Sequence, residues 1–228
     1  VGSEMCIRDR SDTHHGREVD MLITTGEQVS ISLMAMTFAH LGASAVSLTG
    51  AQAGICCRGV HGKAFIDKVL PSRVFQELEK GNIVIVAGFQ GVLPNGDIAT
   101  LGRGGSDATA VALAGAMHAD MCEIFTDVDG VYSADPRYCP EAIKMQEITN
   151  IEMLELARLG AGVMQPRSVE LGLQYHIPIH VRSTFTNEEG TIIREESTLE
   201  GNNCIIKGVA QDTNTVSYTH LRAHETLR

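Results

Sequence analysis

The stretch Ile83-Val84-Ile85-Val86-Ala87 is an unbroken apolar run, rich in β-branched residues, that stops at Gly88. A run of this kind is typical of a strand buried on both faces, as in a parallel sheet. Outward from it, short apolar runs predict strands at 45–48, 121–125 and 179–182, and helical periodicity predicts helices at 27–41, 108–118, 151–159 and 168–175. Strands that alternate with helices indicate an α/β domain with a mainly parallel sheet flanked by helices.

The composition indicates a globular chain that binds neither membranes nor nucleic acid. Of its 228 residues, 43% are hydrophobic, which is enough for a sizeable core in one large domain or in one domain and part of another. No apolar stretch is long enough to span a bilayer, and residues 1–10 lack the apolar centre of a secretory signal. The net charge of −10 disfavours nucleic acid as a partner, although it does not exclude a small anionic ligand held by local donors.

The cysteines and histidines show no ligand spacing typical of a metal site, and no metal is predicted. The cysteines form no C-x-x-C pair and are interpreted as free thiols in a reducing compartment, which predicts a cytoplasmic location. The adjacent pair Cys56-Cys57 leaves a metal or redox site open as an alternative. The cysteines are Cys6, Cys56, Cys57, Cys122, Cys139 and Cys204.

The composition changes near both ends of the chain. A polar, charged break at 187–203 predicts that the main domain covers residues 10–200. Residues 204–210 are expected to form one strand, which opens a second unit at 204–215. Residues 1–9 and 216–228 share no pattern with their neighbours and are interpreted as non-native tails, similar to translated adapter sequence, with both native termini missing.

A glycine-rich turn, Gly102-Arg103-Gly104-Gly105-Ser106-Asp107, stands directly before the predicted helix at 108–118. Its glycines allow positive φ and close approach of a ligand, and the first turn of a helix attracts anions. Arg103 can hold a carboxylate or phosphate with two parallel hydrogen bonds. The simpler interpretation is a helix entrance capped by Ser106 or Asp107. The turn is neither a Walker P-loop nor a dinucleotide fingerprint.

An acidic loop, Thr126-Asp127-Val128-Asp129-Gly130-Val131-Tyr132, follows the predicted strand at 121–125 and continues into Ser133-Ala134-Asp135-Pro136-Arg137. Ligands of open α/β sheets bind beyond the carboxyl ends of the strands, where this loop is expected. The alternative is an ordinary Asp-Gly turn with a solvated arginine.

In this order and spacing, residues 101–107 and 126–137 resemble the aspartate kinase branch of the amino acid kinase family. The segments 20–27, 49–54 and 86–91 carry the same resemblance, which covers nearly all of residues 17–215. Residues 126–132 are shared across the wider family, whereas 103–107 are specific to aspartate kinases. The resemblance implies a three-layer α/β sandwich, incomplete in this chain.

The resemblance implies transfer of the γ-phosphoryl group of ATP, bound with Mg²⁺, to the β-carboxylate of L-aspartate, which is the first step of lysine, threonine and methionine biosynthesis. It implies that Asp107 and Arg103 are catalytic. The implied substrate-binding residues are Thr25, Glu27, Arg103, Gly104, Gly105 and Ser106. The implied nucleotide-binding residues are Thr126, Asp127, Tyr132, Ser133, Ala134, Asp135, Pro136 and Arg137.

The sequence departs from the family pattern in two places. The family's opening strand and Lys-[FY]-Gly-Gly loop are absent, and Gly162 stands where the family commonly has a nucleotide-contacting lysine. Because phosphoryl transfer depends on cations, we expect the chain as given to transfer slowly or not at all, although its parent is an active kinase. Residues 206–215 resemble the start of an ACT regulatory domain, and the parent is expected to be a homo- or hetero-oligomer.

Two other functions stay open from the sequence. One is a family kinase that acts on a different carboxylate or phosphate. The other is a non-catalytic module that binds a nucleotide or an amino acid and regulates a partner subunit.

Overall fold

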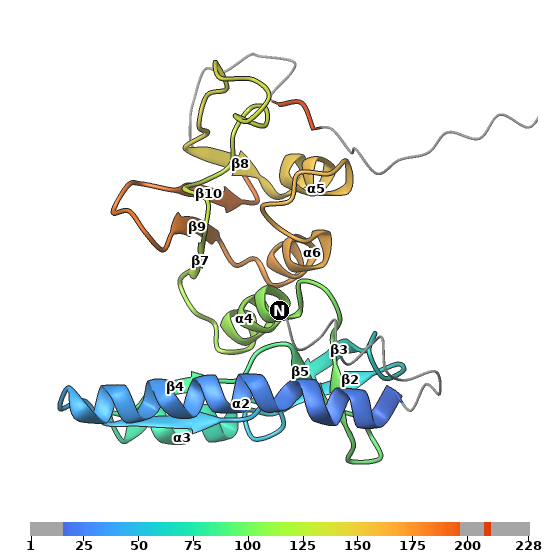
Figure 1. The fold of residues 1–228 in the computed structure, drawn as a ribbon, viewed down its shortest axis with the longest axis vertical. Helices are drawn as coiled ribbons and strands as arrows, with labels where there is room; N and C mark the ends of the chain where they lie inside the picture. The colour runs from blue at the N-terminus through green and yellow to red at the C-terminus, as the bar shows by residue number, and fades with distance from the viewer. Residues whose placement is uncertain (1–15, 197–207, 211–228) are drawn as a thin grey trace, which may run out of the picture.

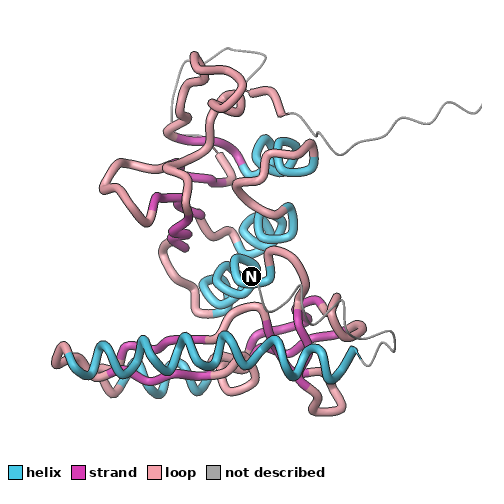
Figure 2. Tube along the Cα trace, in the orientation of Figure 1, coloured by secondary structure: helices cyan, strands magenta, loops and turns pink. Residues whose placement is uncertain are grey.

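The computed structural model describes residues 16–196 and 208–210. Its elements form two halves that meet at helix α4 (Gly105–Ala116) (Figure 1). The first half is a flat layer along the long helix α2 (Gly16–His40), and the second rises from it as a stack of three helices beside a sheet (Figures 1 and 2).

The first half contains two small sheets. Strands β1 (Ala45–Leu48) and β4 (Ile83–Val86) pair in parallel. The other sheet has the order β3-β2-β5-β6, in which β2 pairs with β5 in parallel and the remaining pairs are antiparallel. Its strands are β2 (Ile55–Arg58), β3 (Phe65–Val69), β5 (Gln90–Val92) and β6 (Ile98–Thr100), and helix α3 (Ser72–Glu79) precedes β4.

The second half contains one mixed sheet of order β7-β9-β10-β8, beside helices α4, α5 and α6 (Figure 1). Parallel pairs join β7 to β9 and β10 to β8, whereas β9 and β10 are antiparallel. The strands are β7 (Cys122–Thr126), β8 (Glu147–Thr149), β9 (Ile179–Ser183) and β10 (Thr191–Arg194), and the helices are α5 (Asn150–Arg158) and α6 (Pro166–Tyr175).

Helix α4 packs against both hydrophobic cores. Val111 belongs to the core of the second half, and Leu113 and Met117 pack against the core of the first. Alanine at alternate positions keeps the helix narrow, and Ala108 and Ala112 are fully buried. The glycine-rich turn that opens α4 therefore starts from a helix fixed on two sides.

The α/β fold predicted from the sequence is confirmed, and four of the seven strand pairings among the described residues are parallel. Every helix and strand predicted within those residues is present. Their ends differ from the predicted ones by a few residues, except in α2, where the difference is larger. The strands do not form one sheet in the described part of the chain, because β4 and β7 have no hydrogen bonds to each other.

Three predictions of local structure were wrong. Helix α2 begins at Gly16 and not near residue 27, because buried polar side chains such as Asp20 and Thr24 hold its first half in place where apolar periodicity gives no signal. Strand β4 is not buried on both faces, since Ile83 is 39% exposed. The expected break at 187–203 contains β10, whose Ile193 is fully buried.

Several predictions concern residues outside the described part of the chain. These are the tails at 1–9 and 216–228 and most of the strand and second unit at 204–215. Residues 208–210 are described and have no regular secondary structure, so the strand predicted at 204–210 does not extend through them. No helix of the described residues has the length and apolarity that crossing a bilayer requires.

Candidate active site

The glycine-rich turn enters α4 through left-handed backbone. Gly102 and Gly104 have φ of 74° and 70°, and Gly104 is the N-cap without any side-chain hydrogen bond. The interpretation of Ser106 or Asp107 as the cap was wrong, because α4 already begins at Gly105 and both residues lie in its first turn. The first N–H groups of a helix lack intrahelical partners, so this uncapped turn offers donors to an anion.

Arg103 lies at the tip of this turn with its side chain exposed. Within the described residues its guanidinium makes no hydrogen bond or ion pair. The backbone just before the turn is fixed by Arg167, whose Nη1 donates to the carbonyl of Leu101 at 2.9 Å and to that of Ala64 at 3.2 Å. A fixed backbone and an unpaired guanidinium leave Arg103 able to bind a carboxylate or phosphate.

Glu27 and Ser106 line one cavity of about 480 Å³, although they are far apart in the sequence. Gly88 lies between β4 and α4, and a Cβ added there would stand 3.3 Å from the Ser106 Oγ. Thr109 adds a further polar group, and its hydroxyl accepts from the Phe89 N–H at 3.2 Å. The remaining lining is apolar and consists of Val74, Leu78, Val84, Val86, Ala110, Leu113 and Met117.

Thr25 lies on the same helix as Glu27 but faces solvent, and its hydroxyl donates to the Leu22 carbonyl of its own helix at 2.6 Å. Gly104 and Gly105 are packed into the structure. A Cβ on Gly104 would stand 2.1 Å from Cγ of Gln165, and one on Gly105 would stand 2.9 Å from Phe89. Of the substrate residues predicted from the sequence, Arg103, Gly104, Gly105 and Ser106 therefore lie at the start of α4, only Glu27 and Ser106 line the cavity, and Thr25 is not brought to either.

Asp107 lies in the first turn of α4 and is partly buried. Burial raises the pKa of its carboxyl group, and it makes no hydrogen bond or ion pair within the described residues. Burial, followed by the charges of Asp107 and Glu123, raises the pKa of the Cys122 thiol to about 11. An unpaired carboxylate in such a position is a functional-site candidate, since the protein does not neutralise it.

The acidic loop after β7 is organised by Asp129. Its carboxylate accepts from the Tyr132 hydroxyl at 3.0 Å and lies 3.2 Å from Nζ of Lys144. Burial raises the pKa of Asp129, but the hydrogen bonds from Tyr132 and Lys144, with one from the backbone, outweigh burial and hold that pKa below its ordinary value. Gly130 has φ of 148°, and a Cβ there would stand 2.7 Å from the Thr191 hydroxyl.

The remaining residues predicted to bind a nucleotide lie along the same loop. Thr126 ends β7 and donates from its hydroxyl to Asp127 at 3.1 Å. The Ser133 hydroxyl accepts from the Ile143 N–H at 3.0 Å. Asp135 accepts from both Nε and Nη2 of Arg137, while Ala134 is partly buried and Pro136 is exposed. Within the described residues, no hydrogen bond or ion pair joins this loop to Arg103, Ser106 or Asp107.

Sequence reasoning missed three residues that shape these segments. Lys144 neutralises Asp129, Gln165 packs on Gly104, and the Thr191 hydroxyl accepts from the Val131 N–H at 2.8 Å. All three are distant in sequence from the groups they contact. A lone lysine, glutamine or threonine carries no local signal, and only the fold reveals these contacts.

The cysteines that the structure describes, Cys56, Cys57, Cys122 and Cys139, are free thiols, as the sequence predicts. Burial, followed by the charges of Cys56 and Asp67, raises the pKa of the Cys57 thiol to about 11. Among the described residues no group of three or more His, Cys, Asp or Glu side chains is arranged to hold a metal ion.

The chain is similar to known proteins over most of its length. Residues 3–183 match the amino acid kinase family. An aspartokinase of Geobacillus stearothermophilus is 55% identical over 194 residues, which cover 85% of this chain and 47% of that protein. The chain thus spans about half the length of the curated relatives it matches.

Solved structures agree with this similarity. The structure of an aspartate kinase from Synechocystis matches this one with a TM-score of 0.72 at 47% identity. The match covers 84% of this chain and 32% of the Synechocystis chain. Aspartokinase III of E. coli, solved in complex with aspartate and ADP, matches with a TM-score of 0.73 at 30% identity. That match covers 82% of this chain and 42% of the E. coli chain. From the family match over most of its length, the chain belongs to the amino acid kinase family.

Proposed function

We propose that the protein to which this chain belongs is an aspartate kinase, which transfers the γ-phosphoryl group of ATP to the β-carboxylate of L-aspartate and forms 4-phospho-L-aspartate. The observation that carries the proposal is the cavity shared by Glu27 and Ser106 beside the uncapped start of α4. The similarity to aspartokinases supports the choice of aspartate within the family.

The proposed reaction needs no strong general base. The β-carboxylate of aspartate has a pKa near 4 and is already ionised at neutral pH. The site must therefore bring two anions together and neutralise the charge that develops between them. The unpaired Arg103 guanidinium is suited to this task, as are the N–H groups of Ser106 and Asp107, which have no partner among the described residues.

In this proposal Arg103 binds the α-carboxylate of aspartate, and Ser106 donates to a substrate oxygen. Glu27 accepts from the substrate ammonium, either directly or through the network around it. The polar side chains of the cavity would bind the charged groups of aspartate. The apolar lining would contact the methylene group of the substrate or pack against neighbouring elements.

The nucleotide is proposed to lie along the loop of residues 126–137, where Tyr132 is oriented by Asp129 and Arg137 by Asp135. Mg²⁺ prefers oxygen ligands and arrives with the phosphates, whose charge it neutralises when bound. Since no cluster of three or more His, Cys, Asp or Glu side chains among the described residues is arranged to hold a metal ion, Mg²⁺ would be held mainly by the phosphates, with the partly buried, unpaired carboxylate of Asp107 as a protein contact. Asp107 also orders the cationic groups around the phosphates.

The parent protein is proposed to be cytoplasmic, to act in the synthesis of lysine, threonine and methionine, and to form an oligomer. Residues 10–200 are proposed as its catalytic domain and 204–215 as the start of a regulatory one. These points rest on the similarity to aspartokinases and on the free thiols.

The direct test couples ADP release to NADH oxidation with L-aspartate as acceptor, alongside calorimetric titration of the chain with aspartate. Binding of aspartate by this chain, together with turnover by the full-length parent protein that stops when L-glutamate or N-acetyl-L-glutamate replaces aspartate, supports the proposal. Preference for either substitute contradicts it in favour of another family kinase. Binding of ATP with no binding of aspartate contradicts it in favour of a regulatory module.

A further inference from the structure

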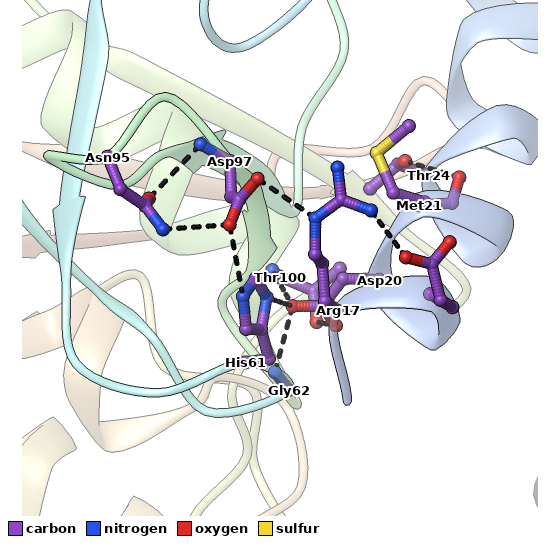
Figure 3. Close-up of polar contacts among 10 residues, drawn as sticks. Arg17, Asp20, Met21, Thr24, His61, Gly62, Asn95, Asp97 and Thr100 are labelled. Atoms are coloured by element: carbon purple, nitrogen blue, oxygen red, sulfur yellow. Dashed lines mark hydrogen bonds and ion pairs between the residues drawn. The ribbon is translucent and has the colours of Figure 1, made fainter. Parts of the chain in front are cut away.

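Asp20 is a fully buried carboxylate on the first half of α2, aimed at the end of β6 (Figure 3). Its Oδ1 accepts from the Thr100 hydroxyl at 2.7 Å, and its Oδ2 accepts from the backbone N–H groups of Thr100 and Gly62, each at 3.0 Å. The same Oδ2 lies 3.0 Å from Nδ1 of His61. A charged group is almost never buried to this extent unless it is paired, and here donors surround both oxygens.

Around this carboxylate the start of α2 is joined to two other segments. Nε2 of His61 lies 4.0 Å from Asp97, and Asp97 accepts from Nε of Arg17 in the first turn of α2 at 2.9 Å (Figure 3). The Arg17 pair lies at the surface, where ion pairs contribute little. The strength of the connection therefore lies in the buried bonds from Asp20 to Thr100.

The two ends of this connection lead to the proposed substrate site. Asp20 precedes Glu27 by seven residues, which is two turns of the same helix. Thr100 precedes Arg103 by three residues, at the point where β6 enters the glycine-rich turn. Asp20 thus joins the helix that carries Glu27 to the strand that leads into the turn with Arg103.

We infer that Asp20 is a positioning residue for the substrate site: it sets the separation between Glu27 on α2 and Arg103 in the turn that follows β6. The inference rests on the proposed function, in which these two side chains bind opposite charges of aspartate. Misplacement by about 1 Å costs up to ~100-fold in such sites, and supporting hydrogen bonds hold functional groups to within a fraction of that distance.

The decisive variant is Asp20→Asn, which keeps the shape but presents an amide to donors that require an acceptor. Hydrogen exchange of residues 100–105 in the full chain reports whether the turn is released. Calorimetric titration with L-aspartate reports whether the site is misplaced. We expect faster exchange in this segment and an aspartate Kd raised by ~10-fold or more, with the Kd for ATP changed by less than about twofold.

Thr149→Ala is the matched control. Thr149 caps α5 in a reciprocal capping box with Glu152, and within the described residues it has no hydrogen bond to α2 or β6, so its loss is expected to destabilise the chain at α5. The control is expected to leave the aspartate Kd and the exchange of residues 100–105 unchanged. If Asp20→Asn is destabilised while both readouts match this control, Asp20 has a structural role only and the inference is overturned.

Thr100→Val covers the case in which Asp20→Asn does not fold, because it removes only the hydroxyl donor and keeps the backbone N–H. It is expected to raise the aspartate Kd by a few-fold, and Thr100→Ser is expected to restore it. An unchanged Kd in Thr100→Val overturns the inference. If the unaltered chain binds no aspartate, the proposed function fails, while the exchange readout still decides whether Asp20 holds the turn.

Discussion

Gly104 lies directly against Gln165, so closely that a Cβ on residue 104 would stand 2.1 Å from Cγ and 2.6 Å from Cβ of the glutamine. Gln165 is the N-cap of α6, and Gly104 is the N-cap of α4. Two helix entrances therefore meet at this contact, and the position of the glycine-rich turn depends on it.

Gly104→Ala should destabilise the chain by ~1–3 kcal/mol in urea unfolding, because alanine at φ of 70° is strained and its Cβ meets Gln165. Gln165→Ala in the same chain should recover only the part due to Cγ, because the Cβ of residue 165 stays 2.6 Å from the added one and the backbone strain remains. Gly162→Ala is the control, since a Cβ there meets nothing within 4 Å. A Gly104→Ala variant as stable as the control would show that the turn can move away from α6.

Asp107→Asn should raise the melting temperature at neutral pH. Burial raises the pKa of Asp107, so the folded state favours the protonated form and the ionised carboxylate opposes folding at neutral pH. Asparagine removes that cost, and the gain should disappear below about pH 4, where the carboxyl group is protonated in both folded and unfolded chains. In the proposed function the same substitution abolishes phosphoryl transfer. A lower melting temperature at pH 7 would mean that Asp107 has a stabilising partner when folded.

Lys144→Met should shift acid unfolding to higher pH, as followed by circular dichroism. The lowered pKa of Asp129 contributes stability that is present above about pH 4 and lost as the pH falls through its folded pKa. Without Lys144, burial remains and only the Tyr132 hydroxyl and a backbone hydrogen bond oppose it, so the pKa of Asp129 rises and the carboxylate protonates at higher pH. Lys68→Met, at an exposed lysine of β3, is the control. An identical acid limb in both variants would rule out the Lys144 contact as a source of stability.

Gly162→Lys should tighten nucleotide binding. Gly162 stands where a family lysine is expected, and a side chain there would extend into open space. We expect the Kd for ATP to fall by about 5- to 10-fold and the melting temperature to stay within about 1 °C, because one added cation near a phosphate contributes on the order of 1 kcal/mol. Gly162→Gln has a similar reach without charge and should leave the Kd unchanged. Equal effects of Lys and Gln would indicate a contact that does not involve charge.

Local sequence determined the elements whose signal is local. The apolar run at 83–87 predicts β4 because β-branched residues fit a pleated strand, and the alanine-rich stretch after residue 107 predicts α4. The glycines of residues 102–105 indicate an unusual turn before α4, and the motif order points to the amino acid kinase family.

Only the tertiary structure decided what joins these elements. Apolar periodicity cannot reveal that Asp20 is buried, because a carboxylate is expected at the surface until its donors, such as Thr100, are in place. The strand β10 within a polar stretch, and the meeting of Glu27 with Ser106 at one cavity, depend in the same way on residues far away in the chain. The sequence by itself determined which side chains are available for chemistry, and long-range packing and buried hydrogen bonds decided which of them meet, because those interactions exist only once the chain is folded.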